Sequence, residues 1–361
     1  MLEFSEGNSN LLLIKIIYKM TNKFQFSKII LMVFTSALFL NCNSGPKSSE
    51  QGKAKENLEE KTVDKESDFK ISLAQWSLHN TYFGEPIKDW GEFARMVKES
   101  PDSLLKGNID PKDFPELAAG YGIYTIELVN TFYFSKVDDM EYWKAFKKKC
   151  NDANVSVGLI MVDLVGNLAD ADEAVRLKAV EDHHKWVDIA SFLGAGAIRV
   201  NAGGQGSAEE VAVNAVDGLS KLGTYGASKG VNILVENHGG YSSDGSWLSG
   251  VMRKINMENV GTLPDFGNFC IEYGQDGCNK EYDKYKGIEE LMPFAKGVSA
   301  KSHNFDENGN ETKSDFLKIM KIVKESGFKG NVGIEYEGKE LSEDDGIKAT
   351  KALLEKVFAE L

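Results

Sequence analysis

Four side chains of metal-ligand type follow four successive apolar runs in the second half of the chain. Glu236 lies in NILVENHGG, Asp265 in GTLPDFGNF, His303 in GVSAKSHNFD and Glu335 in GIEYEG. An oxygen-rich set with one imidazole suits Mn²⁺, Mg²⁺ or Co²⁺, and less exclusively Zn²⁺. The alternative for any one acidic residue is a helix N-cap or a loop salt bridge. Because four such residues follow consecutive runs, the sequence predicts one bound divalent metal ion with positions left open for substrate.

Further polar and aromatic side chains are expected to reach the same place and contact a substrate. They are Trp76, Glu127, Arg199, Asn201, His238 and Lys301. For Glu127 and Arg199 the alternative is a structural ion pair, and for Trp76 it is core packing. Lys301 either holds an anionic oxygen of the substrate or balances the acidic site. Glu337 shares a strand face with Glu335, so the two could exchange roles.

Eight short apolar runs position these residues, with longer amphipathic stretches between them. The runs are 69–76, 122–130, 155–162, 195–201, 231–237, 260–265, 297–303 and 331–337. Spacing of about 30–50 residues is the size of a βα unit with its loops. The pattern predicts an α/β fold, a single (β/α)₈ TIM barrel over 69–361, whose strand carboxyl ends form the active face. A doubly wound sheet is disfavoured, because no phosphate-binding glycine fingerprint follows the first run.

The first crossover, 77–121, is long and contains four prolines, so it is expected to hold an inserted lid or short extra helices. Glycines such as Gly194 and Gly230 stand where left-handed helix C-caps are expected.

The N-terminal segment has the pattern of an export signal. Residues 29–40 form an apolar run preceded by Lys23 and Lys28, shorter than the roughly 18–20 residues that span a bilayer. Residues 1–41 are therefore interpreted as an upstream extension and a signal peptide. Leu40-Asn41-Cys42 resembles a bacterial lipoprotein signal, which implies a lipid on Cys42; cleavage nearby or a short uncleaved anchor are the alternatives. Residues 42–68 are predicted to be a flexible tether, because they contain few large apolar side chains.

These features predict an exported protein, a periplasmic or outer-membrane lipoprotein that meets the membrane only through its anchor. The net charge of −13 has the wrong sign for binding a nucleic-acid backbone. Four cysteines are too few for a disulfide framework in a chain of 361 residues. Cys270 and Cys278 are the only plausible close pair, and the sequence leaves open whether they are bridged. It also leaves the oligomeric state open.

The residues after the last four runs look like those of the xylose-isomerase-like barrel superfamily. The matching segments are Glu-Asn-His-Gly-Gly, Pro-Asp-Phe-Gly-Asn, His-Asn-Phe-Asp and Glu-Tyr-Glu-Gly. This superfamily includes sugar-phosphate isomerase/epimerases, ketose 3-epimerases and, more distantly, the endonuclease IV group. In the ketose 3-epimerases, four residues of this order and type bind one divalent ion, and the two glutamates also move the proton. The resemblance implies the same roles for Glu236, Asp265, His303 and Glu335. Asn268 stands where the family often has a histidine, which changes a substrate-oxygen contact.

The expected function is that of a divalent-metal-dependent sugar isomerase or epimerase on a small carbohydrate outside the cytoplasm. A carboxylate would remove a proton next to a carbonyl, through an enediolate, and a second would return it. One alternative is a 3-keto-glycoside lyase that uses the same deprotonation for β-elimination. Another is a carbohydrate-binding lipoprotein without catalysis. Endonuclease activity is disfavoured, because the chain has only five histidines and a negative charge.

Overall fold

The computed structural model describes residues 68–275 and 277–361. The predicted upstream extension, the signal segment, Cys42 and the tether as far as residue 67 lie outside the described residues. Within the described part, no helix combines the length and apolarity that a membrane span requires.

Eight parallel strands form one sheet in the order β6-β5-β4-β3-β2-β1-β10-β9. They are β1 Phe69–Ala74, β2 Thr125–Val129, β3 Ser156–Met161, β4 Ala197–Val200, β5 Asn232–Glu236, β6 Val260–Leu263, β9 Val298–Ser302 and β10 Gly330–Tyr336. Parallel bridges from Thr262 to Ala295 and from Asp265 to Ser299 join the two ends of the sheet. The sheet is therefore closed into a barrel. Each predicted run overlaps one of these strands, so the predicted fold class is confirmed.

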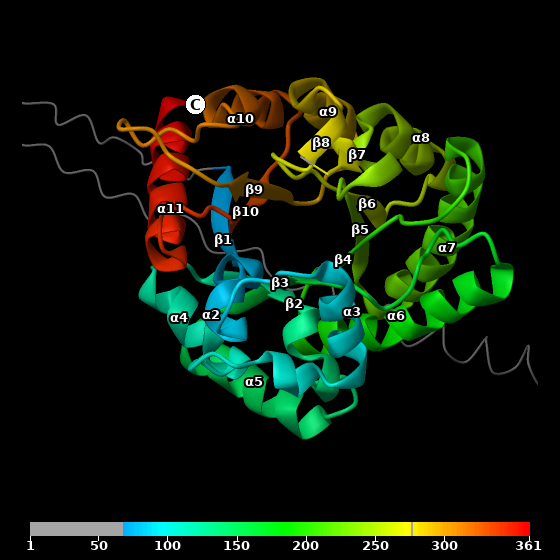
Figure 1. Cartoon of the computed structure of the whole chain (residues 1–361), viewed down its shortest axis with the longest axis horizontal. Coiled ribbons are helices and arrows are strands. Elements are labelled where there is room, and N and C mark those ends of the chain that lie inside the picture. Colours follow the sequence, from blue (N-terminus) through cyan, green and yellow to red (C-terminus); the bar gives the residue numbers. More distant parts are fainter. Residues whose placement is uncertain (1–67, 276) are drawn as a thin grey trace, which may run out of the picture. The chain divides into compact units, whose positions relative to one another are not determined.

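Helices surround the ring of strands (Figure 1). They are α2 His79–Phe83, α3 Trp90–Glu99, α4 Phe114–Gly120, α5 Met140–Asp152, α6 Glu173–Leu193, α7 Ala208–Lys229, α8 Gly245–Ile255, α9 Lys284–Leu291, α10 Phe316–Glu325 and α11 Glu343–Glu360. From α5 onward, each begins after an Asp or Ser whose side chain accepts a hydrogen bond from a first-turn N–H. Gly194 and Gly230 end α6 and α7 with positive φ, as the sequence predicts.

Two segments depart from a plain alternation of strand and helix. The long first crossover contains α2, α3, α4 and short 3₁₀ turns, which confirms the predicted extra helices. After β6, the chain forms an antiparallel hairpin of β7 Cys270–Gly274 and β8 Gly277–Glu281, which the sequence analysis did not predict. A disulfide between Cys270 and Cys278 crosses this hairpin and answers the question that the sequence left open.

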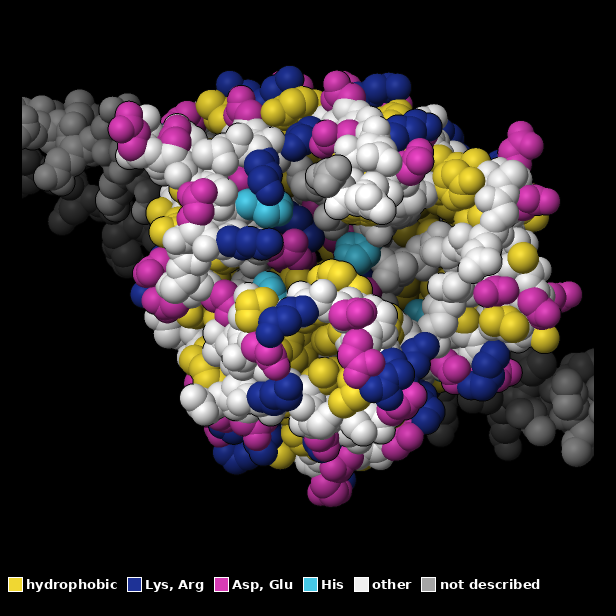
Figure 2. Space-filling model, in the orientation of Figure 1, with side chains coloured by type: hydrophobic (Ala, Val, Ile, Leu, Met, Phe, Trp, Pro, Cys, Tyr) yellow, Lys and Arg dark blue, Asp and Glu magenta, His cyan; other side chains and the backbone are white. Residues whose placement is uncertain are grey.

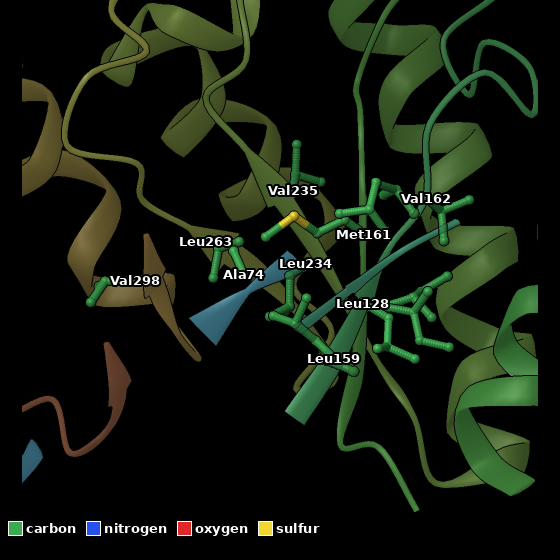
Figure 3. Close-up of a cluster of buried hydrophobic side chains, with 14 of the residues drawn as sticks. Ala74, Leu128, Leu159, Met161, Val162, Leu234, Val235, Leu263 and Val298 are labelled. Carbon is green, nitrogen blue, oxygen red and sulfur yellow. The ribbon is translucent and has the colours of Figure 1, made fainter. Parts of the chain in front are cut away.

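Apolar side chains from the strands fill the protein interior, as Figure 3 shows for Leu128, Met161, Leu234 and Leu263. All four residues of β4 and of β6 are buried, as expected for parallel strands covered on both faces. Buried charged groups are the exception in this interior, and Glu236, Lys301 and Glu335 lie at or next to the carboxyl ends of their strands. The core thus provides a rigid support for the site.

Candidate functional site

Three buried carboxyl groups meet at the carboxyl ends of the barrel strands. Glu236 ends β5, Asp265 follows β6, and Glu335 is the next-to-last residue of β10. One oxygen atom from each lies within 4.8 Å of the others, which is close enough for all three to hold one metal ion. Among the described residues, no second group of three or more His, Cys, Asp or Glu side chains comes so close together.

Lys301 brings a buried positive charge to this cluster. Its Nζ lies 3.2 Å from Glu335 Oε1, 3.4 Å from Glu337 Oε1 and 4.0 Å from Asp265 Oδ2. One pleat below Lys301, Ser299 Oγ lies 2.8 Å from Asp265 Oδ2 and 2.9 Å from Glu335 Oε2. Ser299 and Lys301 both point inward because side chains alternate along a strand. Strand β9 therefore supplies a hydroxyl and an ammonium group to the carboxylates.

A second cation, Arg199 on β4, contacts the cluster at Glu236. Its Nε lies 2.8 Å from Glu236 Oε2, and its NH1 group donates to Asp163 Oδ1 at 2.6 Å. Asn201 Nδ2 also donates to Asp163 Oδ1, at 2.7 Å. The predicted Arg–Glu contact thus forms with Glu236 rather than Glu127. Because Arg199 is buried between two carboxylates, it holds both in fixed positions.

Backbone and amide groups of two loops orient Asp265 and Glu236. Asp265 Oδ1 accepts hydrogen bonds from the N–H groups of Gly267 and Asn268, at 2.7 and 2.8 Å. Asn268 Nδ2 donates to Glu236 Oε1 at 3.1 Å. Asn237 pairs with the backbone of Asp265 through both its amide oxygen and its amide nitrogen. These hydrogen bonds therefore hold the loops after β5 and β6 together next to the carboxylates.

Burial and mutual repulsion disfavour negative charge in this cluster. Burial, with repulsion from neighbouring carboxylates, raises the pKa values of Glu236 and Asp265, although Arg199 and Lys301 oppose the rise. Glu337 differs: burial disfavours its charge, but Lys301 and a 2.6 Å hydrogen bond from Trp76 Nε1 lower its pKa. The two side-chain cations thus compensate the acidic charge only in part.

His303, the fourth predicted metal ligand, lies outside the group of three carboxylates. Strand β9 ends at Ser302, so His303 stands one pleat farther out than Lys301. Its backbone N–H donates to Glu311 Oε1 at 3.2 Å. Burial lowers the pKa of its imidazole to about 4, so the ring is neutral at neutral pH. The three carboxylates are the part of the predicted ligand set that the structure brings together.

The remaining predicted substrate contacts lie at different depths. Asn268 contacts the cluster directly through Glu236, whereas Trp76 donates to Glu337, which lies outside the group of three. Glu127 is buried inside the barrel, where it accepts a 2.6 Å hydrogen bond from Ser72 Oγ. A Cβ at Gly333 would stand 2.7 Å from its carboxyl oxygens, so glycine is needed there. His238 is exposed in the loop after β5. Figure 2 shows acidic, basic and histidine side chains around a hollow near the centre of one face.

Two residues of this site were absent from the sequence-based set. Asp163 directly follows the predicted run 155–162 and is the acidic group at the end of the third strand. A search of every strand end for carboxylates would have found it. Ser299 gave no such signal, because a serine within a buried strand usually satisfies a backbone group.

A family model described as "Xylose isomerase-like TIM barrel" matches residues 115–357. No curated protein matches the chain.

Solved structures of low sequence identity share the fold. A xylose isomerase-like TIM barrel protein from Mycobacterium smegmatis, in complex with magnesium, is 14% identical, with 80% of this chain and 97% of that chain covered and a TM-score of 0.56. The D-allulose 3-epimerase from Methylomonas sp. is 16% identical, with coverage of 81% and 98% and a TM-score of 0.57. The IOLI protein with a bound zinc atom is 13% identical, with coverage of 81% and 98% and a TM-score of 0.58. The barrel, the site at its strand ends and the match over most of the chain lead to one conclusion: this chain belongs to the xylose isomerase-like TIM barrel family.

Proposed function

We propose that this protein is a divalent-metal-dependent sugar isomerase or epimerase. The observation that carries the proposal is the meeting of Glu236, Asp265 and Glu335 within 4.8 Å at the carboxyl ends of the strands. This is the end of the barrel at which the active sites of TIM-barrel enzymes lie.

The residues present fit a hard divalent cation. All three groups offer carboxylate oxygens, the ligands that Mg²⁺ and Mn²⁺ prefer. Glu236 Oε2 is buried and accepts no hydrogen bond from the described residues, although Arg199 Nε lies close to it. A bound cation would use that oxygen and relieve the repulsion between the buried carboxylates. His303 is proposed as a further ligand, because it lies two residues beyond the inward-facing Lys301.

The chain's own groups provide for proton movement. Glu236 and Glu335 reach the site from β5 and β10, which are separated around the barrel by β6 and β9. One carboxylate can therefore remove a proton beside a sugar carbonyl, and the other can return one from a different direction. The Lys301 ammonium group is placed to hold the oxygen on which negative charge develops. A bound divalent cation would polarise the carbonyl and contribute several kcal/mol to this stabilisation.

Two features support a place outside the cytoplasm. The disulfide between Cys270 and Cys278 is typical of oxidising compartments. The predicted signal with Cys42 as its lipid-bearing residue agrees with this, and we propose an exported lipoprotein. Free sugars and glycosides, rather than sugar phosphates, are then the proposed substrates.

Solvent deuterium exchange tests the proposal. Purified protein is incubated in D₂O with a panel of free sugars and 3-keto glycosides, with Mn²⁺ or with EDTA. We expect deuterium to enter a carbon beside the carbonyl only with the metal. The Glu335→Gln variant should exchange 10²–10⁴-fold more slowly, as is typical for loss of a general acid or base. Exposed Glu307, on a loop at the same end of the barrel, gives the control Glu307→Gln, which should exchange at the wild-type rate.

Retained exchange in Glu335→Gln would contradict its role as a base. Release of the aglycone without an epimerised product would identify the lyase alternative, which shares the deprotonation step. Metal binding without exchange at any sugar carbon would identify the binding-protein alternative.

A further inference from the structure

Two exposed aromatic side chains stand at the mouth of the proposed site. Trp90, the first residue of α3, is 62% exposed, and Tyr273 on β7 is 66% exposed. The third exposed large aromatic residue of the described part is Tyr124, at 53%, directly before β2 and thus at the opposite end of the barrel. Single exposed aromatics are common on protein surfaces. Two of them on separate segments at the active face call for a common explanation.

Trp90 is connected to the carboxylate cluster through Trp76. The two indole rings are stacked with centroids 6.3 Å apart and an angle of 30° between their planes. Trp76 Nε1 in turn donates to Glu337 Oε1, which lies 3.4 Å from Lys301 Nζ. Trp90 is therefore one indole farther from the carboxylates than Trp76. A single sugar ring held over the carboxylates would meet Trp76 first.

Tyr273 approaches the site from the disulfide-bridged hairpin. Its ring packs on the loop after β5, where a Cβ added at Gly239 would stand 3.3 Å from Tyr273 Cε2. Gly239 follows His238 and lies three residues beyond Glu236. In the hairpin, Tyr273 is paired with Cys278, and a disulfide joins Cys278 to Cys270 across the two strands. The bridge thus holds an exposed ring beside the mouth.

These rings come from segments that lie outside the elements of the barrel itself. Trp90 belongs to the first crossover, before the residues 115–357 that match the family model. Tyr273 belongs to the extra hairpin between β6 and α9. The additions to the barrel therefore carry aromatic surface to the active face without adding a charged group to the cluster.

We propose that Trp90 and Tyr273 form an outer subsite for the ring of an aglycone, so that the substrate is a glycoside with a second ring rather than a free monosaccharide. This inference rests on the proposed function, because it places the first sugar ring over the carboxylates. Flat aromatic side chains bury the apolar faces of sugar or aryl rings and leave hydroxyl groups in water. Trp76 stacks on Trp90 and donates to Glu337, so the outer position lies one indole farther from the carboxylates than the first sugar ring.

Binding measurements test the subsite without requiring turnover. The probes are methyl and phenyl glycosides of glucose, galactose, mannose and xylose, titrated against the intact protein by calorimetry or ligand-observed NMR. For at least one sugar, we expect the phenyl glycoside to bind about tenfold more tightly than the methyl glycoside. Trp90→Ala and Tyr273→Ala should each reduce that ratio to about twofold or less and leave methyl glycoside affinity unchanged. Trp90→Phe should retain part of the preference.

Tyr124→Ala is the matched control, because it removes an exposed aromatic ring at the opposite end of the barrel. The inference is overturned if no sugar shows a preference for the phenyl glycoside, or if Trp90→Ala weakens both glycosides equally. Thermal unfolding of each variant checks that the fold is kept. A phenyl preference without deuterium exchange would contradict the proposed function alone, whereas exchange without any phenyl preference would contradict this inference alone.

Discussion

The floor and the rim of the proposed site differ in burial, in charge and in the elements that carry them. The floor consists of charged and polar side chains that strands or strand ends hold in place. Seven of them are buried: Glu127, Arg199, Glu236, Asp265, Ser299, Lys301 and Glu335; Asp163 is half-buried. The rim consists of Trp90 and Tyr273, which are exposed and lie on an inserted crossover and an extra hairpin. Floor residues are fixed by hydrogen bonds and ion pairs, whereas rim residues depend on the packing of local segments.

This difference assigns the proposed chemistry to the floor and the proposed selection of substrate to the rim. The floor carries the charges that can bind a cation and move a proton, and it needs the low mobility of a barrel core. In our proposal the rim selects which glycosides bind, and it can change without disturbing those charges. Substitutions in the floor should therefore alter stability and chemistry together. Substitutions in the rim should alter binding while stability stays almost constant.

Removal of the buried ammonium group is expected to have the largest effect on stability. Lys301→Met leaves Glu335, Glu337 and Asp265 without the cation that lies 3.2 to 4.0 Å from them. Breaking a buried ion pair by removing one partner typically costs about 3–5 kcal/mol. We expect a loss of that size in the free energy of unfolding, measured with urea in the presence of EDTA at neutral pH.

Exposed Lys321 on α10 provides the control Lys321→Met, which should change stability by no more than about 0.5 kcal/mol. Added Mn²⁺ should recover part of the loss in Lys301→Met, because a divalent cation would replace the missing positive charge. A loss below about 1 kcal/mol in EDTA would show that Lys301 does not neutralise the floor.

The floor also predicts a pH dependence that the rim lacks. Burial raises the pKa of Glu127 from its usual 4.5 to about 7, with repulsion from Glu335 and Glu236 adding to the rise and Ser72 opposing it. Between pH 4.5 and about 7, Glu127 therefore keeps its proton in the folded state but loses it in the unfolded state. The resulting stability is complete below pH 4.5 and is lost as the pH rises through 7, by about 3 kcal/mol in total.

Glu127→Gln keeps an acceptor for Ser72 but cannot titrate, so its stability should fall less steeply over this pH range than that of the wild type. Urea unfolding at several pH values in EDTA measures the difference. Trp90→Ala, which changes no titratable group, should give the wild-type slope. Parallel curves for Glu127→Gln and the wild type would exclude Glu127 as the source of the dependence.

The floor could be predicted from the sequence to the extent that strand alternation determines it. Buried runs that end in Glu236, Asp265 and Glu335 predict carboxylates at one end of the barrel, and the structure brings all three together. His303 shows the limit of that reasoning. A strand face predicts which residues point inward, but not how far up the barrel each one lies. Only the observed register, with Lys301 opposite Glu335, shows that Ser299 and Lys301 are the close residues.

The rim could be predicted much less well. The prolines of 77–121 indicate an insertion, yet nothing in its sequence shows that Trp90 stacks on Trp76. The hairpin escaped prediction because all of β8 and part of β7 are exposed and carry no buried alternation. A disulfide joins its two strands, and sequence spacing allows such a bridge without requiring it. Long-range contacts between loops thus account for most of what the sequence left out.

The smallest effect should come from removing the disulfide, and it tests the rim directly. The bridge spans a separation of 8 residues, for which loop-closure entropy gives about 2.5 kcal/mol at most. Since the hairpin lies outside the barrel sheet, we expect Cys270→Ser combined with Cys278→Ser to lower global stability by less than this. The preference for phenyl over methyl glycosides should fall two- to fivefold, because Tyr273 is paired with Cys278.

Wild-type protein reduced with a phosphine should behave like the double variant. Deuterium exchange on the methyl substrate should remain at the wild-type rate in both; if it falls as far as in Glu335→Gln, the hairpin supports the floor, and the separation between the two regions does not hold.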